Sequence, residues 1–113
     1  MIEVKKEGII LKKTELSFEN DGVLNPAVIR VGDRVHIFYR AVSQGNYSTI
    51  GHCELEGPLT ILERHNTPVL LPELDFESHG VEDPRIVKID KVYYITYTAF
   101  DGVNALGALV TST

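Results

Sequence analysis

The chain has 113 residues, of which 43% are hydrophobic and 24% are charged, and this length suffices for one domain with a modest core. Lys and Arg number 11 against 16 Asp and Glu, so the formal net charge of −5 excludes binding through phosphate neutralisation and argues against nucleic acid as a partner. The single cysteine, Cys53, excludes an internal disulfide framework.

The N-terminal residues open the chain without a recognisable targeting segment. The longest early apolar stretch covers only residues 9–11, which is far shorter than the core of a signal peptide or a membrane span. We therefore expect a cytoplasmic protein with no membrane partner.

The sequence predicts an all-β chain. Apolar residues do not keep helical spacing over any long window, because Gly, Pro and β-branched residues interrupt it. Several short runs are instead rich in Val, Ile, Tyr and Thr, which is typical of strands. The predicted strands cover residues 27–31, 35–41, 49–55, 59–63, 85–89, 92–99 and 106–111.

Turn residues separate these strands. Gly32-Asp33 and Asp90-Lys91 are two-residue breaks with the spacing of tight β-hairpins. Residues 43–46 and 101–104 form longer polar breaks, each followed by another strand. Two similar groups of three strands are therefore expected in succession.

The chain also repeats itself in sequence. Aligning residue 25 with residue 83 gives an offset of 58 residues, and we expect this register to hold without gaps. Asn-Pro then falls on Asp-Pro at the start of the repeat. Three hydrophobic positions and the loop residue Asn46 also match identical residues, at 95, 97, 99 and 104.

A repeat of about four short strands is typical of a β-propeller blade. We predict an N-terminal segment over residues 1–24, a first blade over residues 25–82 and an incomplete second blade over residues 83–113. Propellers usually contain about 4 to 8 blades, so we expect either a fragment of a longer protein or self-association that completes the ring. The fragment is the favoured alternative.

The residues that open each repeat form a candidate polar site. Proline restricts its predecessor to extended conformations, so Asn25 and Asp83 are expected at the beginning of innermost strands that line a common channel. Arg40 lies near the end of the second strand, where its guanidinium would bind sugar hydroxyls or raise the anionic character of a neighbouring acid. These three residues are predicted to converge at one mouth of the channel.

Several segments of the chain resemble glycoside hydrolase family 130, the β-mannoside phosphorylases and related enzymes. The most specific of them is Gly-Val-Glu-Asp-Pro-Arg-Ile over residues 80–86. The others are Phe-Glu-Asn-Asp-Gly-Val-Leu-Asn-Pro-Ala over residues 18–27, Phe-Tyr-Arg-Ala over 38–41, Pro-Val-Leu over 68–70 and Thr-Tyr-Thr-Ala over 96–99.

This resemblance implies a five-bladed β-propeller that cleaves β-mannoside oligosaccharides with inversion. It implies that Asp83 is the single catalytic acid, and that Asn25 and Arg40 bind the mannosyl unit before the cleaved bond. Inorganic phosphate is the implied co-substrate, and no cofactor or metal is implied. The family's phosphate-binding residues lie in later blades, outside this chain. A β-mannoside hydrolase that uses water, or a noncatalytic glycan-binding module, are the alternatives.

Other residues near these motifs have competing interpretations. Glu82 is the alternative acid to Asp83, and side chains of neighbouring strand residues point to opposite faces, so only one of the pair is expected to face the channel. Arg85 has two interpretations of equal weight: it forms an ion pair with Glu82 or Asp83, or it contacts a ligand. The four histidines, His36, His52, His65 and His79, lack metal-ligand spacing and are expected as strand or surface residues. Cys53 is expected to be buried, and Tyr39, Tyr93, Tyr94 and Tyr97 are expected to pack the blades.

Overall fold

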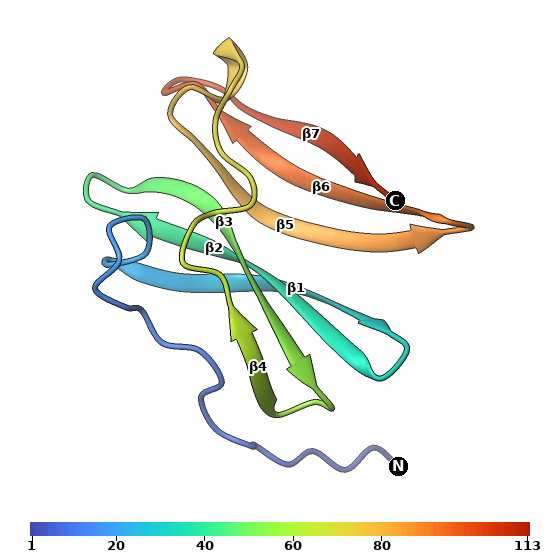
Figure 1. Ribbon diagram of the computed structural model, residues 1–113. Coiled ribbons are helices and arrows are strands. Elements are labelled where there is room, and N and C mark those ends of the chain that lie inside the picture. Colours follow the sequence, from blue (N-terminus) through green and yellow to red (C-terminus); the bar gives the residue numbers. More distant parts are fainter.

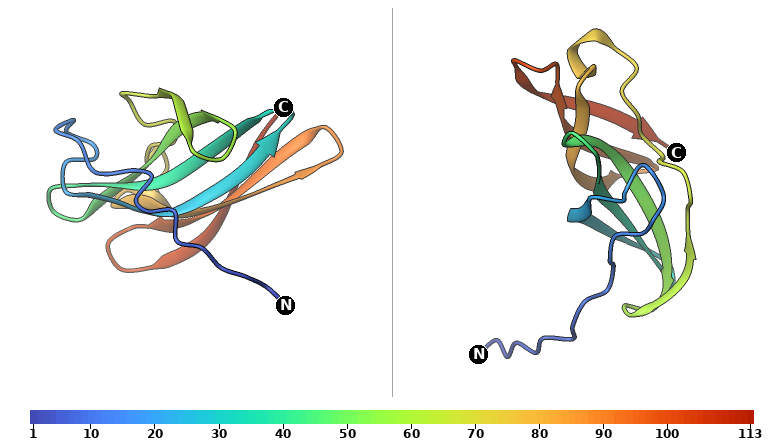
Figure 2. Two further views of the ribbon diagram at one scale, coloured as in Figure 1. Left: turned by 90° about the horizontal axis from the view of Figure 1, so that it is seen from below. Right: turned by 90° about the vertical axis from the view of Figure 1, so that its left-hand side faces the viewer.

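A computed structural model describes all residues, 1–113. It contains seven strands and one 3-10 turn, so the all-β prediction is confirmed, and each predicted strand overlaps an observed one. The first residues of the chain extend away from the sheet (Figure 2), whereas Leu11 and Phe18 pack against its core. The elements are β1 (Gly22–Val31), β2 (Arg34–Ser43), β3 (Tyr47–Glu56), β4 (Thr60–Arg64), η1 (Asp75–Glu77), β5 (Gly80–Ile89), β6 (Val92–Phe100) and β7 (Ala105–Ser112).

The strands form two antiparallel groups, β1–β4 and β5–β7, which can be told apart in Figure 1. Together they make one seven-stranded sheet in the order β1-β2-β3-β5-β6-β7, with β4 paired to β3. Within each group, every strand pairs with the next one along the chain. The groups are connected through a single parallel pair, Ser48 with Gly80. A side chain at Gly80 would place its Cβ 3.3 Å from the Ser48 backbone nitrogen, so the two chains approach each other closely there.

Both predicted two-residue hairpins are present. Gly32 has a φ of 63° between β1 and β2, and Asp90 has a φ of 56° between β5 and β6. Glycine adopts this left-handed conformation freely, and Asp tolerates it better than most residues do. The turn chemistry therefore fixes both hairpins at the same place in the two groups.

The two groups repeat each other closely. β1 and β5 begin 58 residues apart, and each carries a bulge at its fourth and fifth residues. The same offset holds for β2 and β6, which begin at Arg34 and Val92. The predicted gapless register ends at the turn that follows these strands. Tyr39 pairs with Gly51, whereas Tyr97 pairs with Ala108, which is one residue earlier than the offset predicts.

The shorter turn between β6 and β7 explains this difference. The carboxylate of Asp101 accepts hydrogen bonds from the backbone N–H groups of Val103 and Asn104, at 2.9 and 2.6 Å, and so closes the turn. Asn104 therefore corresponds to Tyr47 in the strand pairing, and the predicted match between Asn46 and Asn104 is wrong.

The apolar core has two clusters. One lies within the first group and contains Ile37, Tyr39, Ala41, Cys53 and Leu55. The second joins the two groups, because it contains Ile50 of β3 together with Val81, Tyr97 and Ala99 of the second group. The expected burial of Cys53 is thereby confirmed, as is the packing role of Tyr39 and Tyr97, whereas Tyr93 and Tyr94 are only half-buried. No helix in the structure is long and apolar enough to cross a membrane.

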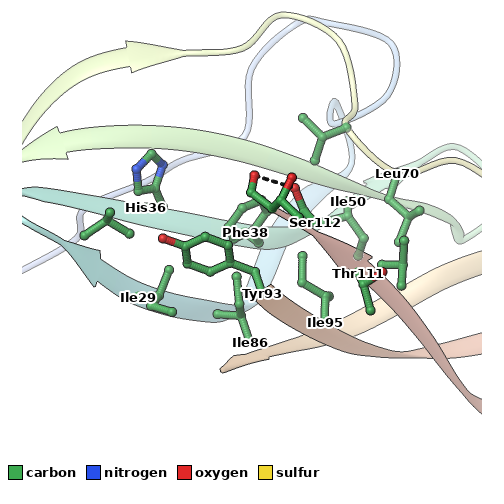
Figure 3. Close-up of a pocket in the computed structure, with 14 residues that line it drawn as sticks. Ile29, His36, Phe38, Ile50, Leu70, Ile86, Tyr93, Ile95, Thr111 and Ser112 are labelled. Carbon is green, nitrogen blue, oxygen red and sulfur yellow. Dashed lines mark hydrogen bonds between the residues drawn. The ribbon is translucent and has the colours of Figure 1, made fainter. Parts of the chain in front are cut away.

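An open pocket of about 420 Å³ lies between the two strand groups (Figure 3). Its walls are mostly apolar and include Ile29, Phe38, Ile86 and Ile95. None of the three predicted site residues lines it. We interpret it as incomplete packing between the groups, because 10 of its 14 lining residues are hydrophobic.

Candidate active site

The backbone at Asn25 and Asp83 differs from the expected extended conformation. Both residues have a left-handed φ, 48° for Asn25 and 54° for Asp83, and both lie at the fourth residue of their strand instead of at its beginning. Each sits in the bulge that interrupts the pairing of its strand. The prediction of extended residues at strand starts is therefore wrong, and the proline that follows marks the bulge.

The bulges explain how these two side chains meet. A bulge bends its strand and redirects the side chain, and Asn and Asp are the non-glycine residues that best tolerate a left-handed backbone. The Asn25 Nδ2 donates a hydrogen bond of 2.7 Å to the Asp83 Oδ1, across the packed strands β1 and β5. Two residues 58 positions apart thus form one polar pair.

Arg40 on β2 joins this pair. Its Nη1 lies 3.8 Å from the Asp83 Oδ1, and its Nη2 lies 2.9 Å from the Glu82 Oε2. Its Nε donates a hydrogen bond of 2.8 Å to the Ser48 Oγ. The side chain of Arg40 is only 15% exposed, so the guanidinium is held from three directions inside the site.

Glu82 and Asp83 both contact the guanidinium of Arg40, although neighbouring residues of a regular strand point to opposite faces. The regular alternation of side chains between faces fails at the bulge. The two acids still differ in accessibility, since the side chain of Glu82 is 20% exposed and that of Asp83 is 37% exposed. Asp83 is thus the acid that a ligand can reach more easily.

Arg85 does not take part in this network. Its Nη1 donates a hydrogen bond of 3.1 Å to the carbonyl of the neighbouring Pro84, and the ion-pair partner of Glu82 is Arg40 instead. The ion pair that the sequence suggested for Arg85 is therefore absent.

Sequence reasoning missed Ser48, whose side chain is fully buried below Arg40. Ser48 also forms the only backbone pair between the two strand groups. Ser48 lies two residues from Ile50, the strand partner of Arg40, so pairing the two strands that flank the predicted loop at residues 43–46 could have identified it.

His36, His52 and His65 form a cluster elsewhere in the first strand group, which no spacing in the sequence indicates. The His36 Nδ1 and the His52 Nε2 are 2.9 Å apart, and the His52 and His65 rings meet edge to face with centroids 4.7 Å apart. Burial, followed by the neighbouring His65 and His36, lowers the pKa of His52 to about 4. The structure contains no group of three His, Cys, Asp or Glu residues arranged to hold a metal ion.

The arrangement at Asp83 offers a carboxyl group beside an amide and a guanidinium. A carboxyl group can transfer a proton, while the amide and the guanidinium can bind hydroxyl groups of a polar ligand. Such a combination suits the binding and cleavage of a hydroxyl-rich substrate.

Three comparisons with known proteins agree on one family. The profile described as beta-1,4-mannooligosaccharide phosphorylase, of glycoside hydrolase family 130, matches residues 4–112. The chain is 41% identical to a beta-1,2-mannobiose phosphorylase of Thermoanaerobacter sp. (strain X514), over 78% of this chain and 33% of that protein. It is 34% identical to a 1,2-beta-oligomannan phosphorylase of the same organism, over 88% of this chain and 37% of that protein.

A solved structure shares the fold of the chain. Its description states that the GH130 family of mannoside phosphorylases contains glycoside hydrolases that target beta-1,2 mannosidic linkages in Candida mannan. The two superpose with a TM-score of 0.81 and 25% identity, over 91% of this chain and 35% of that one. The chain thus spans about a third of the length of the relatives that it matches.

Proposed function

Because the chain belongs to glycoside hydrolase family 130, we propose that it carries the catalytic acid and part of the mannose-binding site of a β-mannoside phosphorylase. The observation that supports this most directly is the convergence of Asn25, Arg40 and Asp83, with Asn25 and Asp83 hydrogen-bonded at 2.7 Å. The complete protein is a five-bladed β-propeller in this proposal, and the chain supplies about its first two blades. The repeated strand groups β1–β4 and β5–β7 are consistent with that architecture.

The reaction proposed for Asp83 is a proton transfer. The protonated carboxyl of Asp83 gives its proton to the leaving oxygen, through a hydroxyl of the mannose, as the bond between that oxygen and C1 breaks. An oxygen of inorganic phosphate forms the new bond to C1 from the opposite face, which gives mannose 1-phosphate with inverted configuration and a free sugar. Phosphate is already an anionic nucleophile, so no general base is needed.

Asn25 and Arg40 hold the mannosyl unit in this proposal. Their amide and guanidinium lie beside Asp83, where they can bind the sugar hydroxyls while the acid faces the leaving group. The family description names beta-1,4 linkages and the two relatives name beta-1,2 linkages, so the proposed substrate class is β-mannosides in general.

Hydrolysis is a second candidate function. The description of the solved structure reported above states that the family contains glycoside hydrolases. An inverting hydrolase needs a second carboxylate that activates water, about 6.5–9.5 Å from the acid. Glu82 does not fit this role well, because it is paired with Arg40 at 2.9 Å.

The test replaces Asp83 with Asn in a chimera, in which residues 1–113 take the place of the matching third of the beta-1,2-mannobiose phosphorylase relative. Turnover of β-mannosides with phosphate is followed as mannose 1-phosphate. Asp83→Asn should lower turnover by roughly 10²- to 10⁴-fold, typical of a lost general acid, and leave sugar affinity nearly unchanged.

Three outcomes would contradict parts of the proposal. Unchanged turnover in Asp83→Asn would move the acid to Glu82 or another residue. Product formation that does not depend on phosphate would favour the hydrolase. Glycan binding without any turnover in the parent chimera would favour a noncatalytic binding module.

A further inference from the structure

The guanidinium of Arg40 is oriented by two contacts that come from different strands, β3 and β5. Its Nε donates a hydrogen bond of 2.8 Å to the Ser48 Oγ, and its Nη2 lies 2.9 Å from the Glu82 Oε2. A guanidinium is planar and rigid, so fixing two of its nitrogens also fixes the third. Ser48 and Glu82 together therefore set the direction of the Arg40 Nη1.

This orientation keeps Arg40 from forming a hydrogen-bonded ion pair with Asp83. The Arg40 Nη1 stays 3.8 Å from the Asp83 Oδ1, which is longer than a hydrogen bond. Oδ1 instead accepts the hydrogen bond of 2.7 Å from Asn25, and Oδ2 has no hydrogen-bond partner in the structure. Asp83 thus retains an oxygen that is free to carry a proton.

The position of Arg40 matters because neighbouring charges decide whether a carboxyl group keeps its proton. A guanidinium in close contact favours the ionised carboxylate, which has no proton to transfer, whereas a neighbouring anion favours the protonated form. Arg40 and Glu82 are the charged groups of this network, and Asn25 is neutral. Glu82 therefore opposes Arg40 in two ways, since it holds the guanidinium away from Asp83 and also compensates its charge.

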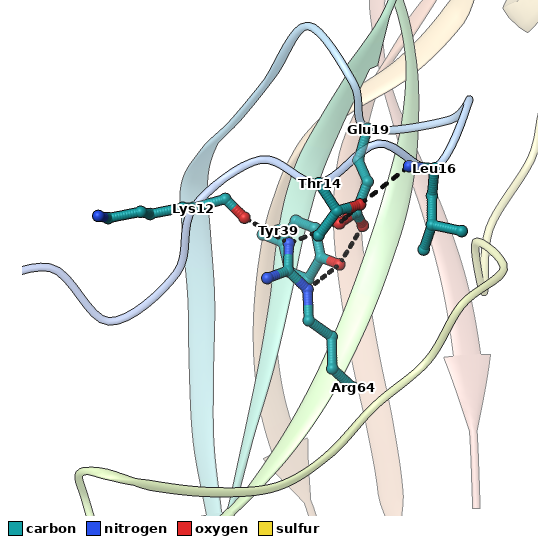
Figure 4. Close-up of polar contacts among 6 residues, drawn as sticks. All are labelled: Lys12, Thr14, Leu16, Glu19, Tyr39 and Arg64. Atoms are coloured by element: carbon teal, nitrogen blue, oxygen red, sulfur yellow. Dashed lines mark hydrogen bonds and ion pairs between the residues drawn. The ribbon is translucent and has the colours of Figure 1, made fainter.

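A second ion pair of the chain shows what a purely structural arrangement looks like. The Arg64 Nη2 lies 2.6 Å from the Glu19 Oε2 (Figure 4). Both oxygens of Glu19 also accept hydrogen bonds, Oε1 from the Tyr39 hydroxyl at 2.7 Å and Oε2 from the Thr14 hydroxyl at 2.8 Å, and its side chain is fully buried. That carboxylate is closed to any ligand, unlike the half-exposed network around Asp83.

We propose that Glu82 is a positioning residue: it holds Arg40 away from Asp83 and compensates the charge of the guanidinium, so that Asp83 keeps the proton that it transfers. This inference rests on the proposed function, because it takes Asp83 as the acid. Glu82 acts only through Arg40 and Asp83 and transfers no proton itself. The Arg40 Nη1, which donates to no acceptor within the chain, stays available to a sugar hydroxyl.

The test replaces Glu82 with Gln in the chimera described above. Glutamine has nearly the size of glutamate and can still accept a hydrogen bond from Arg40, so the variant removes the charge and keeps the shape. The values of kcat and KM for β-1,2-mannobiose with inorganic phosphate are measured between about pH 5 and pH 8, where the protonation of a catalytic acid limits the rate.

Asp83 should lose its proton more easily in Glu82→Gln, because the charge of Arg40 is no longer compensated. The decline of kcat toward high pH should therefore begin about one pH unit lower, so that kcat above this decline falls roughly tenfold. It should return to the unaltered value as the pH is lowered, and KM should change little, because Arg40 and Asn25 remain. Loss of a structural contact would not give this recovery.

Glu54→Gln is the matched control. Glu54 forms a cross-strand ion pair with Arg34 at 3.3 Å, at the opposite end of β3 from Ser48, and its replacement removes the same charge. This variant should leave the pH dependence of kcat unchanged. If Glu82→Gln does not fold, Glu82→Asp takes its place: its carboxylate is one methylene farther from Arg40, so the decline of kcat should move in the same direction by a smaller amount.

Three results would overturn the proposal. The first is the same pH dependence of kcat in Glu82→Gln as in the unaltered chimera. The second is an equal loss of kcat at every pH, which would give Glu82 a structural role only. The third is the same displacement in Glu54→Gln, which would assign it to the overall charge. Failure of the proposed function is recognised separately, because Asp83→Asn would then keep full turnover.

Discussion

Arg40 shows how one side chain can organise the candidate site. Its guanidinium contacts Ser48, Glu82 and Asp83, which belong to different strands of the two groups. A lysine would keep the charge but lose the planar array of donors that makes these contacts together. The site therefore depends on the shape of this cation as well as on its charge.

Removal of the Ser48 hydroxyl should loosen Arg40 without changing its charge. In the chimera described above, Ser48→Ala should raise KM for the mannoside several-fold and change kcat less, since Arg40 is proposed to bind the substrate rather than to transfer the proton. Ser43→Ala is the control, because Ser43 donates only to the carbonyl of Tyr47 in an exposed turn. An equal loss of kcat and kcat/KM in Ser48→Ala would contradict this assignment.

Replacing Asn25 with Asp should create a pH-dependent loss of stability. Two carboxylates would then share the 2.7 Å contact, and their repulsion should raise at least one folded-state pKa above its unfolded value. The destabilisation should therefore be full at neutral pH, about 1–2 kcal/mol, and should disappear as the pH falls through that raised pKa. Urea unfolding of Asn25→Asp and of the unaltered chain at pH 7 and pH 4 measures it.

A loss of the same size at both pH values would contradict the charge repulsion. Asn25→Ser is the matched control, since it shortens the side chain without adding a charge and should show no such recovery at low pH.

His52 gives a second pH dependence with the opposite sign. Its folded pKa of about 4 lies below the usual value of 6.5, and His36, His65 and Glu54 are the titratable groups that act on it. The unfolded chain therefore binds a proton first as the pH falls, so stability should decrease by roughly 1–3 kcal/mol between about pH 6.5 and pH 4. His52→Gln should flatten this part of the stability curve. An unchanged slope in that variant would contradict the assignment to His52.

At the scale of the elements, the sequence predicted the strands better than it predicted the site. Alternating β-branched residues and two-residue turns identify all seven strands and both hairpins. The same rules failed at Asn25 and Asp83, because a bulge reverses the facing of side chains and the sequence rules used assume a regular strand. Ser48 and the ion pair of Arg40 with Glu82 depend on contacts across strands, which local patterns do not encode.

Gly51 illustrates a packing constraint between two paired strands. The ring of Tyr39 lies across Gly51, so a Cβ at that position would collide with the ring carbons. Gly51→Ala should lower the free energy of unfolding by about 1–3 kcal/mol, the usual cost of overpacking. Gly107→Ala in β7 is the control, because nothing lies within 4 Å of its added Cβ. Equal effects of the two substitutions, measured by urea unfolding, would show that the Tyr39 ring moves aside.

At the scale of the whole molecule, the core is small for the length of the chain. Only 19 of the 113 residues are buried, and they include the charged side chains of Glu19 and Glu77. Many large apolar side chains remain exposed, among them Val28, Val87 and Leu109. The burial of apolar surface that stabilises folded domains is therefore limited here.

This small core predicts a low free energy of unfolding for the 113-residue chain. We expect a value at or below the lower end of the usual range, about 5 kcal/mol. Urea unfolding followed by circular dichroism at 25 °C measures it. A cooperative transition with a free energy well above that value would show that the exposed apolar faces contribute less to instability than their area suggests.

The single backbone pair between Ser48 and Gly80 has a consequence for hydrogen exchange. With so few backbone bonds between them, β1–β4 and β5–β7 can open as two separate cooperative units, each with its own protection of amide hydrogens. Asp83 belongs to one unit, and Asn25 and Arg40 belong to the other. Every opening of the less stable unit therefore takes the acid away from its two partners, so the fraction of molecules with an assembled site is set by the local stability of that unit.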